Sequence, residues 1–187
     1  MRTRKVVLST SSEKETFNVG VAVGSLLKAN TIIALGGELG VGKTLFIKGA
    51  AKSLGVDCIL RSPTFTLLQE YIGAIPIYHF DFYRLEEEEE LWEIGFHEYL
   101  ENGGIVFIEW AFKFPSSLPD ERLDIFIETY NLRDSFLHNR RKLYLVPYGE
   151  YYENLVDKLL EINQYDSQGK LMHQEIAEKD KGGAGNC

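Results

Sequence analysis

The chain has 187 residues, the length of one ordinary domain, and 44% of them are hydrophobic, enough for a single well-packed core. With 26% charged and 12% aromatic residues, the composition excludes a collagen-like, mucin-like or wholly disordered protein. The net charge of −8 disfavours binding to nucleic acid without a partner, because phosphate neutralisation needs a basic surface.

Cysteine usage and the N-terminal segment indicate the cellular compartment in which the protein is expected. Cys58 and Cys187 lie far apart and form no cluster with metal-binding spacing, so neither a disulfide framework nor a zinc site is predicted. The apolar run at residues 6–8 is too short for a signal peptide, and no stretch approaches the roughly 18 apolar residues of a membrane helix. We therefore expect a cytoplasmic protein with no membrane partner.

Strand and helix patterns alternate along the chain. Strands are predicted at residues 5–8, 31–35, 61–68, 75–81, 104–109, 123–130 and 142–146, and helices at residues 12–27, 43–54, 87–100 and 151–162. Ser12 and Glu15 have the spacing of a capping box at the first helix, and Gly55 ends the second. Such alternation predicts an α/β fold with a central, mainly parallel sheet.

The remaining segments are predicted to lie outside this core. Residues 1–162 form the expected domain, and residues 163–187 lose apolar periodicity and are expected to be a flexible tail. The five glutamates at 86–90 are interpreted as a solvated helix start, since carboxylates suit the helix dipole there, with an acidic docking surface as the alternative.

The strongest functional signal is a glycine-rich segment between a predicted strand and a predicted helix. It reads Gly37-Glu38-Leu39-Gly40-Val41-Gly42-Lys43-Thr44 and matches the P-loop pattern. The glycines let successive backbone N–H groups point inward and form an anion nest at a helix N-terminus. Lys43 then reaches the β and γ phosphates, and the Thr44 hydroxyl ligates magnesium. The segment predicts binding of a nucleoside triphosphate with Mg²⁺.

Hydrolysis or transfer needs further groups at neighbouring strand ends. Glu109 ends an apolar strand, where it can hold magnesium or its water shell or polarise the attacking water; a solvent-facing side chain is the alternative. Strand alternation puts His79, Asp81 and Tyr83 on one face, where Asp81 can hold a metal-bound water. Arg84 can pair with phosphate or with an acidic neighbour.

A hydroxyl-rich segment at residues 61–66 is a candidate switch. Pro63 biases Ser62 toward an extended conformation, and threonines follow at positions 64 and 66. A threonine hydroxyl that reaches magnesium or the γ-phosphate only in the triphosphate state would convert nucleotide state into loop order. A plain turn is the alternative interpretation.

Taken together, these motifs identify a family resemblance over about residues 5–160. The P-loop is followed in order by Ser62-Pro63-Thr64-Phe65-Thr66-Leu67, His79-Phe80-Asp81-Phe82-Tyr83-Arg84-Leu85 and Ile108-Glu109-Trp110. This combination closely resembles the TsaE (YjeE) family, the bacterial P-loop ATPases of tRNA threonylcarbamoyladenosine biosynthesis. The resemblance implies a P-loop NTPase-like three-layer sandwich and a weak ATPase that a partner complex stimulates.

The resemblance also implies partners and a division of labour. The implied partners are the tRNA threonylcarbamoyl transferase subunit (TsaD-like) and its inactive paralogue (TsaB-like), which modify adenosine 37 of tRNA. ATP hydrolysis would reset the transferase between turnovers, and tRNA would be reached only through the complex.

Roles for individual residues follow from the same resemblance. Lys43, Asp81 and Glu109 are expected to be catalytic, and Thr44, Glu109 and Asp81 to hold Mg²⁺. The residues expected to contact ATP are Gly37, Glu38, Leu39, Gly40, Val41, Gly42, Lys43, Thr44, Thr64, Thr66, Trp110 and Arg140. Residues 111–114 depart from the family pattern.

Two other kinds of protein also contain a P-loop and are alternative interpretations of this chain. A small-molecule kinase normally gathers several arginines in a lid over the phosphates, and no segment concentrates them here. A nucleotide-gated scaffold would bind ATP and hydrolyse little. A GTPase is disfavoured because no Asn-Lys-x-Asp base-reading segment occurs.

Overall fold

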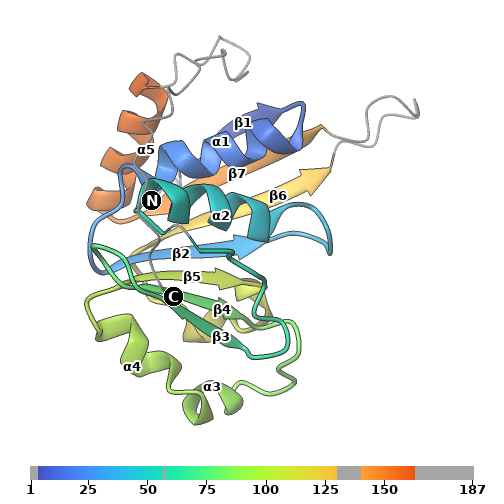
Figure 1. Ribbon diagram of the computed structural model, residues 1–187, viewed down its shortest axis with the longest axis vertical. Helices are drawn as coiled ribbons and strands as arrows, with labels where there is room; N and C mark the ends of the chain where they lie inside the picture. The colour runs from blue at the N-terminus through green and yellow to red at the C-terminus, as the bar shows by residue number, and fades with distance from the viewer. Residues whose placement is uncertain (1–3, 57, 130–139, 163–187) are drawn as a thin grey trace.

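The computed structural model describes residues 4–56, 58–129 and 140–162, which build one seven-stranded sheet in the order β1-β7-β6-β2-β5-β4-β3 (Figure 1). The strands are β1 (Val6–Thr10), β2 (Thr31–Gly36), β3 (Leu68–Tyr71), β4 (Ile77–Asp81), β5 (Ile105–Glu109), β6 (Arg122–Thr129) and β7 (Arg141–Tyr148). The contiguous strands β6, β2, β5 and β4 run parallel, and β1, β7 and β3 pair antiparallel with their neighbours. The predicted α/β fold with a mainly parallel centre is confirmed.

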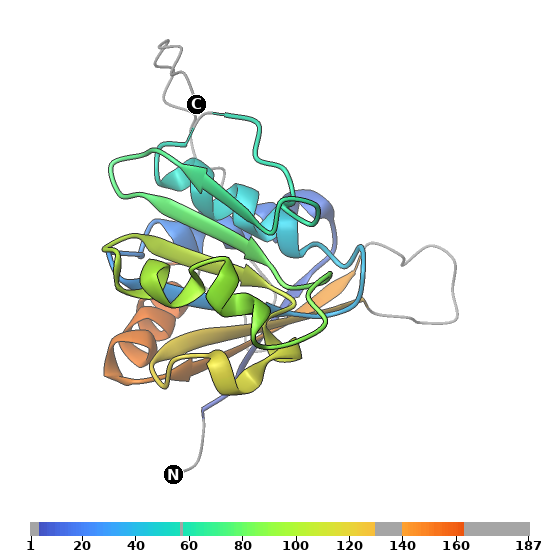
Figure 2. The same cartoon turned by 90° about the horizontal axis from the view of Figure 1, so that it is seen from below.

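Helices cover both faces of this sheet and make three layers. They are α1 (Glu13–Gly24), α2 (Lys43–Ser53), α3 (Glu90–Glu93), α4 (Phe96–Glu101) and α5 (Glu150–Ile162), with 3-10 turns at Ala111–Lys113 and Pro115–Ser117. One core cluster joins α1, α2 and α5 to one face of the sheet. The other joins α3, α4 and the 3-10 turns to the opposite face, as Figure 2 shows for the α3–α4 segment. Within the described ranges, no helix has the length and apolarity to cross a membrane.

The prediction of a strand over residues 61–68 is wrong, because β3 begins only at Leu68. The preceding residues form a turn in which the N–H groups of Thr66 and Leu67 both donate to the carbonyl oxygen of Pro63, at 3.0 and 2.6 Å. Leu67 has a φ of 64°, in the left-handed region. The proline, which lacks an N–H for strand pairing, outweighs the local β-branched and aromatic pattern.

The predicted helix over residues 87–100 is divided in two. Gly95 has a φ of 68° and separates α3 from α4, since a left-handed residue interrupts the helical hydrogen bonds. The acidic run before α3 is a helix start, as expected. The Glu90 carboxylate accepts the N–H groups of Glu86 and Glu87 at 2.6 and 2.9 Å. The predicted tail at 163–187 lies outside the described residues.

Two glycines let α1 and α2 pack backbone against backbone. A Cβ on Gly20 would lie 2.1 Å from the carbonyl oxygen of Phe46, and one on Gly49 would lie 2.1 Å from that of Phe17. Because α2 begins directly after the P-loop, this contact also fixes where the loop ends. Tertiary packing thus sets the direction of the helix N-terminus at the site.

We expect Gly49→Ala to destabilise the protein by about 1–3 kcal/mol despite alanine's higher helix propensity, because the new methyl group overlaps a backbone oxygen that cannot move alone. Chemical denaturation followed by circular dichroism measures the change. Lys52→Ala, at an exposed position of the same helix, is the control and should stay within about 0.5 kcal/mol of the parent. A Gly49→Ala protein as stable as the parent would contradict the close packing of the two helices.

Candidate functional site

The loop between β2 and α2 has the backbone of an anion nest. Gly37, Gly40 and Gly42 have φ values of 127°, 79° and 113°, which favour glycine. A Cβ on Gly37 would also lie 2.2 Å from the carbonyl oxygen of Ile127. Gly42 is the N-cap of α2 and supplies no side chain to cap it, so the first-turn N–H groups face the loop. This arrangement favours an anion at the N-terminus of the helix.

Lys43 places its ammonium group inside this loop. Its Nζ donates to the carbonyl oxygens of Gly37 and Glu38 at 2.8 and 2.9 Å and lies 4.1 Å from the ring centroid of Trp110. Burial lowers the pKa of Lys43, while the negative charges of Glu109 and Asp81 oppose that shift. The cation is thus held where phosphate oxygens would approach the nest.

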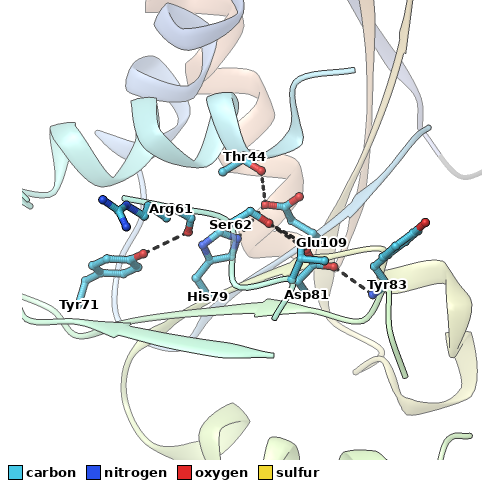
Figure 3. Close-up of polar contacts among 9 residues, drawn as sticks. Thr44, Arg61, Ser62, Tyr71, His79, Asp81, Tyr83 and Glu109 are labelled. Carbon is cyan, nitrogen blue, oxygen red and sulfur yellow. Dashed lines mark hydrogen bonds and ion pairs between the residues drawn. The ribbon is translucent and has the colours of Figure 1, made fainter. Parts of the chain in front are cut away.

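A chain of side-chain hydrogen bonds joins α2 to β5 and β4. The Thr44 hydroxyl donates to Glu109 Oε1 at 2.6 Å, and His79 Nε2 lies 2.9 Å from the same oxygen (Figure 3). Glu109 is only 3% exposed, so its carboxylate lies in the interior at the end of β5. It does not face solvent, and the solvent-facing alternative is therefore wrong.

Asp81 ties the segment at residues 61–67 to the end of β4. Its Oδ2 accepts the hydroxyl groups of Ser62 and Thr64 at 3.0 and 2.5 Å, and its Oδ1 accepts the N–H of Tyr83 at 3.0 Å (Figure 3). Both carboxylate oxygens are therefore engaged. The side-chain hydroxyl groups of the loop are therefore held by this one carboxylate.

These groups surround a cavity of about 420 Å³. Its lining comes from the P-loop, the first turn of α2, the 62–64 segment and the ends of β4 and β5: Glu13, Leu39, Gly40, Gly42, Lys43, Thr44, Leu45, Lys48, Ser62, Thr64, Asp81, Tyr83, Glu109, Trp110 and Arg141. A larger hollow of about 600 Å³ lies along α5 and includes none of these residues. The predicted catalytic and magnesium-binding side chains therefore lie around the P-loop cavity and not around the hollow at α5.

Most residues predicted for the site line this cavity. Three residues of the predicted loop do not line it: Gly37 and Glu38 contact Lys43 through their carbonyl oxygens, and Val41 contacts Arg141 through its own. Thr66 does not line the cavity, and neither does Arg140, which is exposed. Its neighbour Arg141 lines the cavity instead, with Nε donating to the carbonyl oxygen of Val41 at 2.7 Å and a guanidinium nitrogen 3.6 Å from Glu13. Arg141 is the first of the alternating buried positions of β7, whereas Arg140 lies just before the strand and is exposed, and this alternation is the signal that distinguishes the two arginines.

Among the described residues, Arg84 forms no ion pair with an acidic neighbour and contacts an aromatic ring instead. Its guanidinium carbon lies 4.1 Å from the ring centroid of Phe65, at the tip of the 61–67 segment. His79 and Ser62 also contact the site carboxylates, although the sequence pattern singled out neither for that contact.

The donor set fits a magnesium–nucleotide complex. Thr44 and Glu109 supply a hydroxyl and a carboxylate beside the nest, the ligand types that magnesium prefers. Within residues 4–56, 58–129 and 140–162, no three His, Cys, Asp or Glu side chains gather as a self-sufficient metal site. Magnesium usually completes its coordination with water and substrate phosphates, so a two-residue site at this position is consistent with it.

Comparisons with known proteins agree with this geometry. The family model "Threonylcarbamoyl adenosine biosynthesis protein TsaE" matches residues 10–141. The tRNA threonylcarbamoyladenosine biosynthesis protein TsaE of Bacillus subtilis is 36% identical over 151 residues, 80% of this chain and 90% of the relative. The Treponema pallidum protein of the same name is 40% identical over 114 residues, 61% of this chain and 84% of the relative.

A crystal structure of YdiB from Bacillus subtilis has the same fold. It superposes with a TM-score of 0.73 at 30% identity and covers 87% of this chain and 98% of its own. The match spans the P-loop and both site carboxylates, and the relatives are aligned over most of their own length. The chain therefore belongs to the TsaE family of threonylcarbamoyl adenosine biosynthesis proteins.

Proposed function

We propose that this protein binds ATP with Mg²⁺ in the P-loop cavity, hydrolyses it slowly, and thereby serves formation of threonylcarbamoyladenosine at adenosine 37 of tRNA in the cytoplasm. The observation that carries the proposal is the 2.6 Å hydrogen bond between the Thr44 hydroxyl and the Glu109 carboxylate at the mouth of the nest. In P-loop NTPases, magnesium is held by the loop hydroxyl and a strand-end carboxylate, and this pair has that placement.

Binding would use the loop and the first turn of α2. Their N–H groups point at the phosphates, and Lys43 Nζ exchanges the carbonyl oxygens of Gly37 and Glu38 for phosphate oxygens. Thr44 and Glu109 would hold Mg²⁺, which, when bound, neutralises charge on the phosphate oxygens during the reaction. ADP, the leaving group, would keep its two phosphates within the nest.

Glu109 is the better placed of the two carboxylates to act on water. Its Oε1 receives the Thr44 hydroxyl and the contact from His79, whereas no described residue donates to its Oε2. That oxygen is available to accept a proton from, or to orient, an attacking water molecule. Asp81 has no such free oxygen, because Oδ2 accepts from the 61–67 segment and Oδ1 accepts from the N–H of Tyr83, just after β4.

The Asp81 contacts provide a route from nucleotide state to loop position. If the Thr64 hydroxyl turns from Asp81 to magnesium or the γ-phosphate, the loop loses one of its two side-chain contacts with that carboxylate. Phe65, which is 81% exposed at the loop tip, would move with it. A change of this kind can be sensed by a bound protein. We infer that the transferase subunit, with its inactive paralogue, is that protein and is reset between turnovers.

The charge of the chain supports an indirect relation to tRNA. A net charge of −8 gives no general attraction to a polyanion, so contact with tRNA through the transferase complex is the arrangement we propose. The kinase alternative gains no support from the described arginines at the site. Arg84 stacks on Phe65, and Arg141 bonds to the P-loop backbone.

Lys43→Ala should weaken ATP binding by about 100-fold, because a buried charge-assisted contact with phosphate contributes roughly 1.5–3 kcal/mol. Isothermal titration with a slowly hydrolysed ATP analogue and Mg²⁺ measures the dissociation constant. Lys52→Ala removes an exposed lysine from the same helix and should bind as the parent does. Equal affinity of Lys43→Ala and the parent would place the nucleotide elsewhere.

Glu109→Gln should bind ATP almost normally and lose turnover by about 10²- to 10³-fold, because a preorganised charged group typically contributes about 2.7–4 kcal/mol to the barrier. Phosphate release under saturating ATP measures kcat, and titration measures binding separately. Full partner-stimulated turnover by Glu109→Gln would contradict a catalytic role for Glu109 and favour a nucleotide-gated scaffold.

ATP turnover should be slow for the protein alone and rise when the tRNA threonylcarbamoyl transferase complex is added, whereas GTP should be a poorer substrate. The measurement is phosphate release in both conditions, together with the yield of modified tRNA over several turnovers. Lys43→Ala, added in place of the parent, should support no more than the first turnover. If modification continues through many turnovers with Lys43→Ala, hydrolysis does not reset the transferase.

A further inference from the structure

His79 is a buried polar residue that the proposed reaction does not yet explain. It sits in the middle of β4, is 0% exposed, and lies two residues before Asp81, which pairs in register with Glu109 of β5. Its neighbours along this sheet face, Ile77 and Phe107, belong to the hydrophobic core. In Figure 3 the ring rises from β4 on the same side as the Glu109 carboxylate.

The hydrogen bonds of the ring define its tautomer. An ionised carboxylate can only accept, so the 2.9 Å contact with Glu109 Oε1 requires the proton on Nε2 of His79. Nδ1 is buried and has no hydrogen-bond partner among the described residues. A proton on Nδ1 would be a buried donor without an acceptor, so the arrangement favours the tautomer with Nε2 protonated and Nδ1 bare. The ring therefore has one functional contact, and it is directed at Glu109.

We propose that His79 is a positioning residue that holds the Glu109 carboxylate for its action on water, an inference that rests on the proposed ATPase function. Together, the His79 and Thr44 donors occupy Oε1 from two elements, β4 and α2. With Oε1 held by two donors, rotation of the Glu109 carboxylate about the Cγ–Cδ bond is restrained. Oε2 therefore keeps a fixed orientation in the site. Supporting contacts of this kind commonly change activity by about 10- to 100-fold.

Core packing alone does not account for a histidine at this position. A phenylalanine ring has a similar shape and no polar atom, whereas the buried Nδ1 of His79 has no partner among the described residues and lowers stability. A polar group that lowers stability is expected where function needs it. The contact with Glu109 is the only side-chain hydrogen bond of His79 within the described part of the chain.

The test compares His79→Phe, His79→Gln, Glu109→Gln and the double variant of His79→Phe with Glu109→Gln. Glutamine can place an N–H near the position of Nε2, whereas phenylalanine fills the space without a donor. We expect His79→Phe to melt no lower than the parent, to bind ATP with similar affinity, and to lose kcat by about 10- to 100-fold. His79→Gln should recover turnover to within about threefold of the parent.

The double variant separates action through Glu109 from action elsewhere. If His79 works by orienting that carboxylate, His79→Phe should cause little further loss in the Glu109→Gln background, because interacting residues are not additive. Parent-like turnover of His79→Phe, or an equal loss in both backgrounds, would overturn the positioning role. A parent without Lys43-dependent turnover would instead refute the ATPase proposal.

A second measurement does not depend on turnover. Nitrogen-15 NMR of the histidine-labelled protein should show a protonated Nε2 and a bare Nδ1 for His79, with the Nε2 signal shifted in Glu109→Gln. His79→Phe identifies the signal by its disappearance, and His79→Gln does so if the phenylalanine variant does not fold. A protonated Nδ1 with a bare Nε2 would contradict the contact on which the proposal depends.

Discussion

The site depends on the in-register parallel pairing of β4, β5 and β2. That pairing sets Glu109 beside Leu35 on one side and Asp81 on the other, at the edge where all three strands end. Because the P-loop leaves β2 at this same edge, the phosphate nest and both carboxylates meet without any long loop having to carry them. A shift of β5 by one residue would turn Glu109 to the α3–α4 face and separate it from Thr44.

The close packing of α1 on α2 is the second constraint, since it determines where the anion nest points. The glycine contacts bring the two helix backbones together, and Arg141 bonds to the loop from the other side through Val41. The loop is thus fixed before any ligand arrives. Preorganised N–H groups need no reorganisation when phosphate binds, which is where such sites gain their effect.

A feature of the site can be predicted from the sequence when the interactions that determine it are between residues close together in the chain. The P-loop is a local pattern, and Glu109 ends a strand that is apolar throughout, so both are predictable. The turn at Pro63 overrides strand-like neighbours, and the choice of Arg141 over Arg140 follows from the register of β7 against two other strands. The bond from His79 to Glu109 joins residues 30 positions apart and needs the completed sheet.

The sequence presents Asp81 and Glu109 as equivalent strand-end acids, and their hydrogen bonds give them different tasks. Asp81 has both oxygens committed to the backbone of Tyr83 and the hydroxyl groups of the 61–67 segment. Glu109 receives its donors on one oxygen and keeps the other unengaged among the described residues. In the proposed function, chemistry at the phosphate and movement of the loop would therefore be controlled by separate carboxylates that pair in register on neighbouring strands. Their in-register pairing is the direct structural connection through which hydrolysis beside Glu109 would affect the loop held by Asp81.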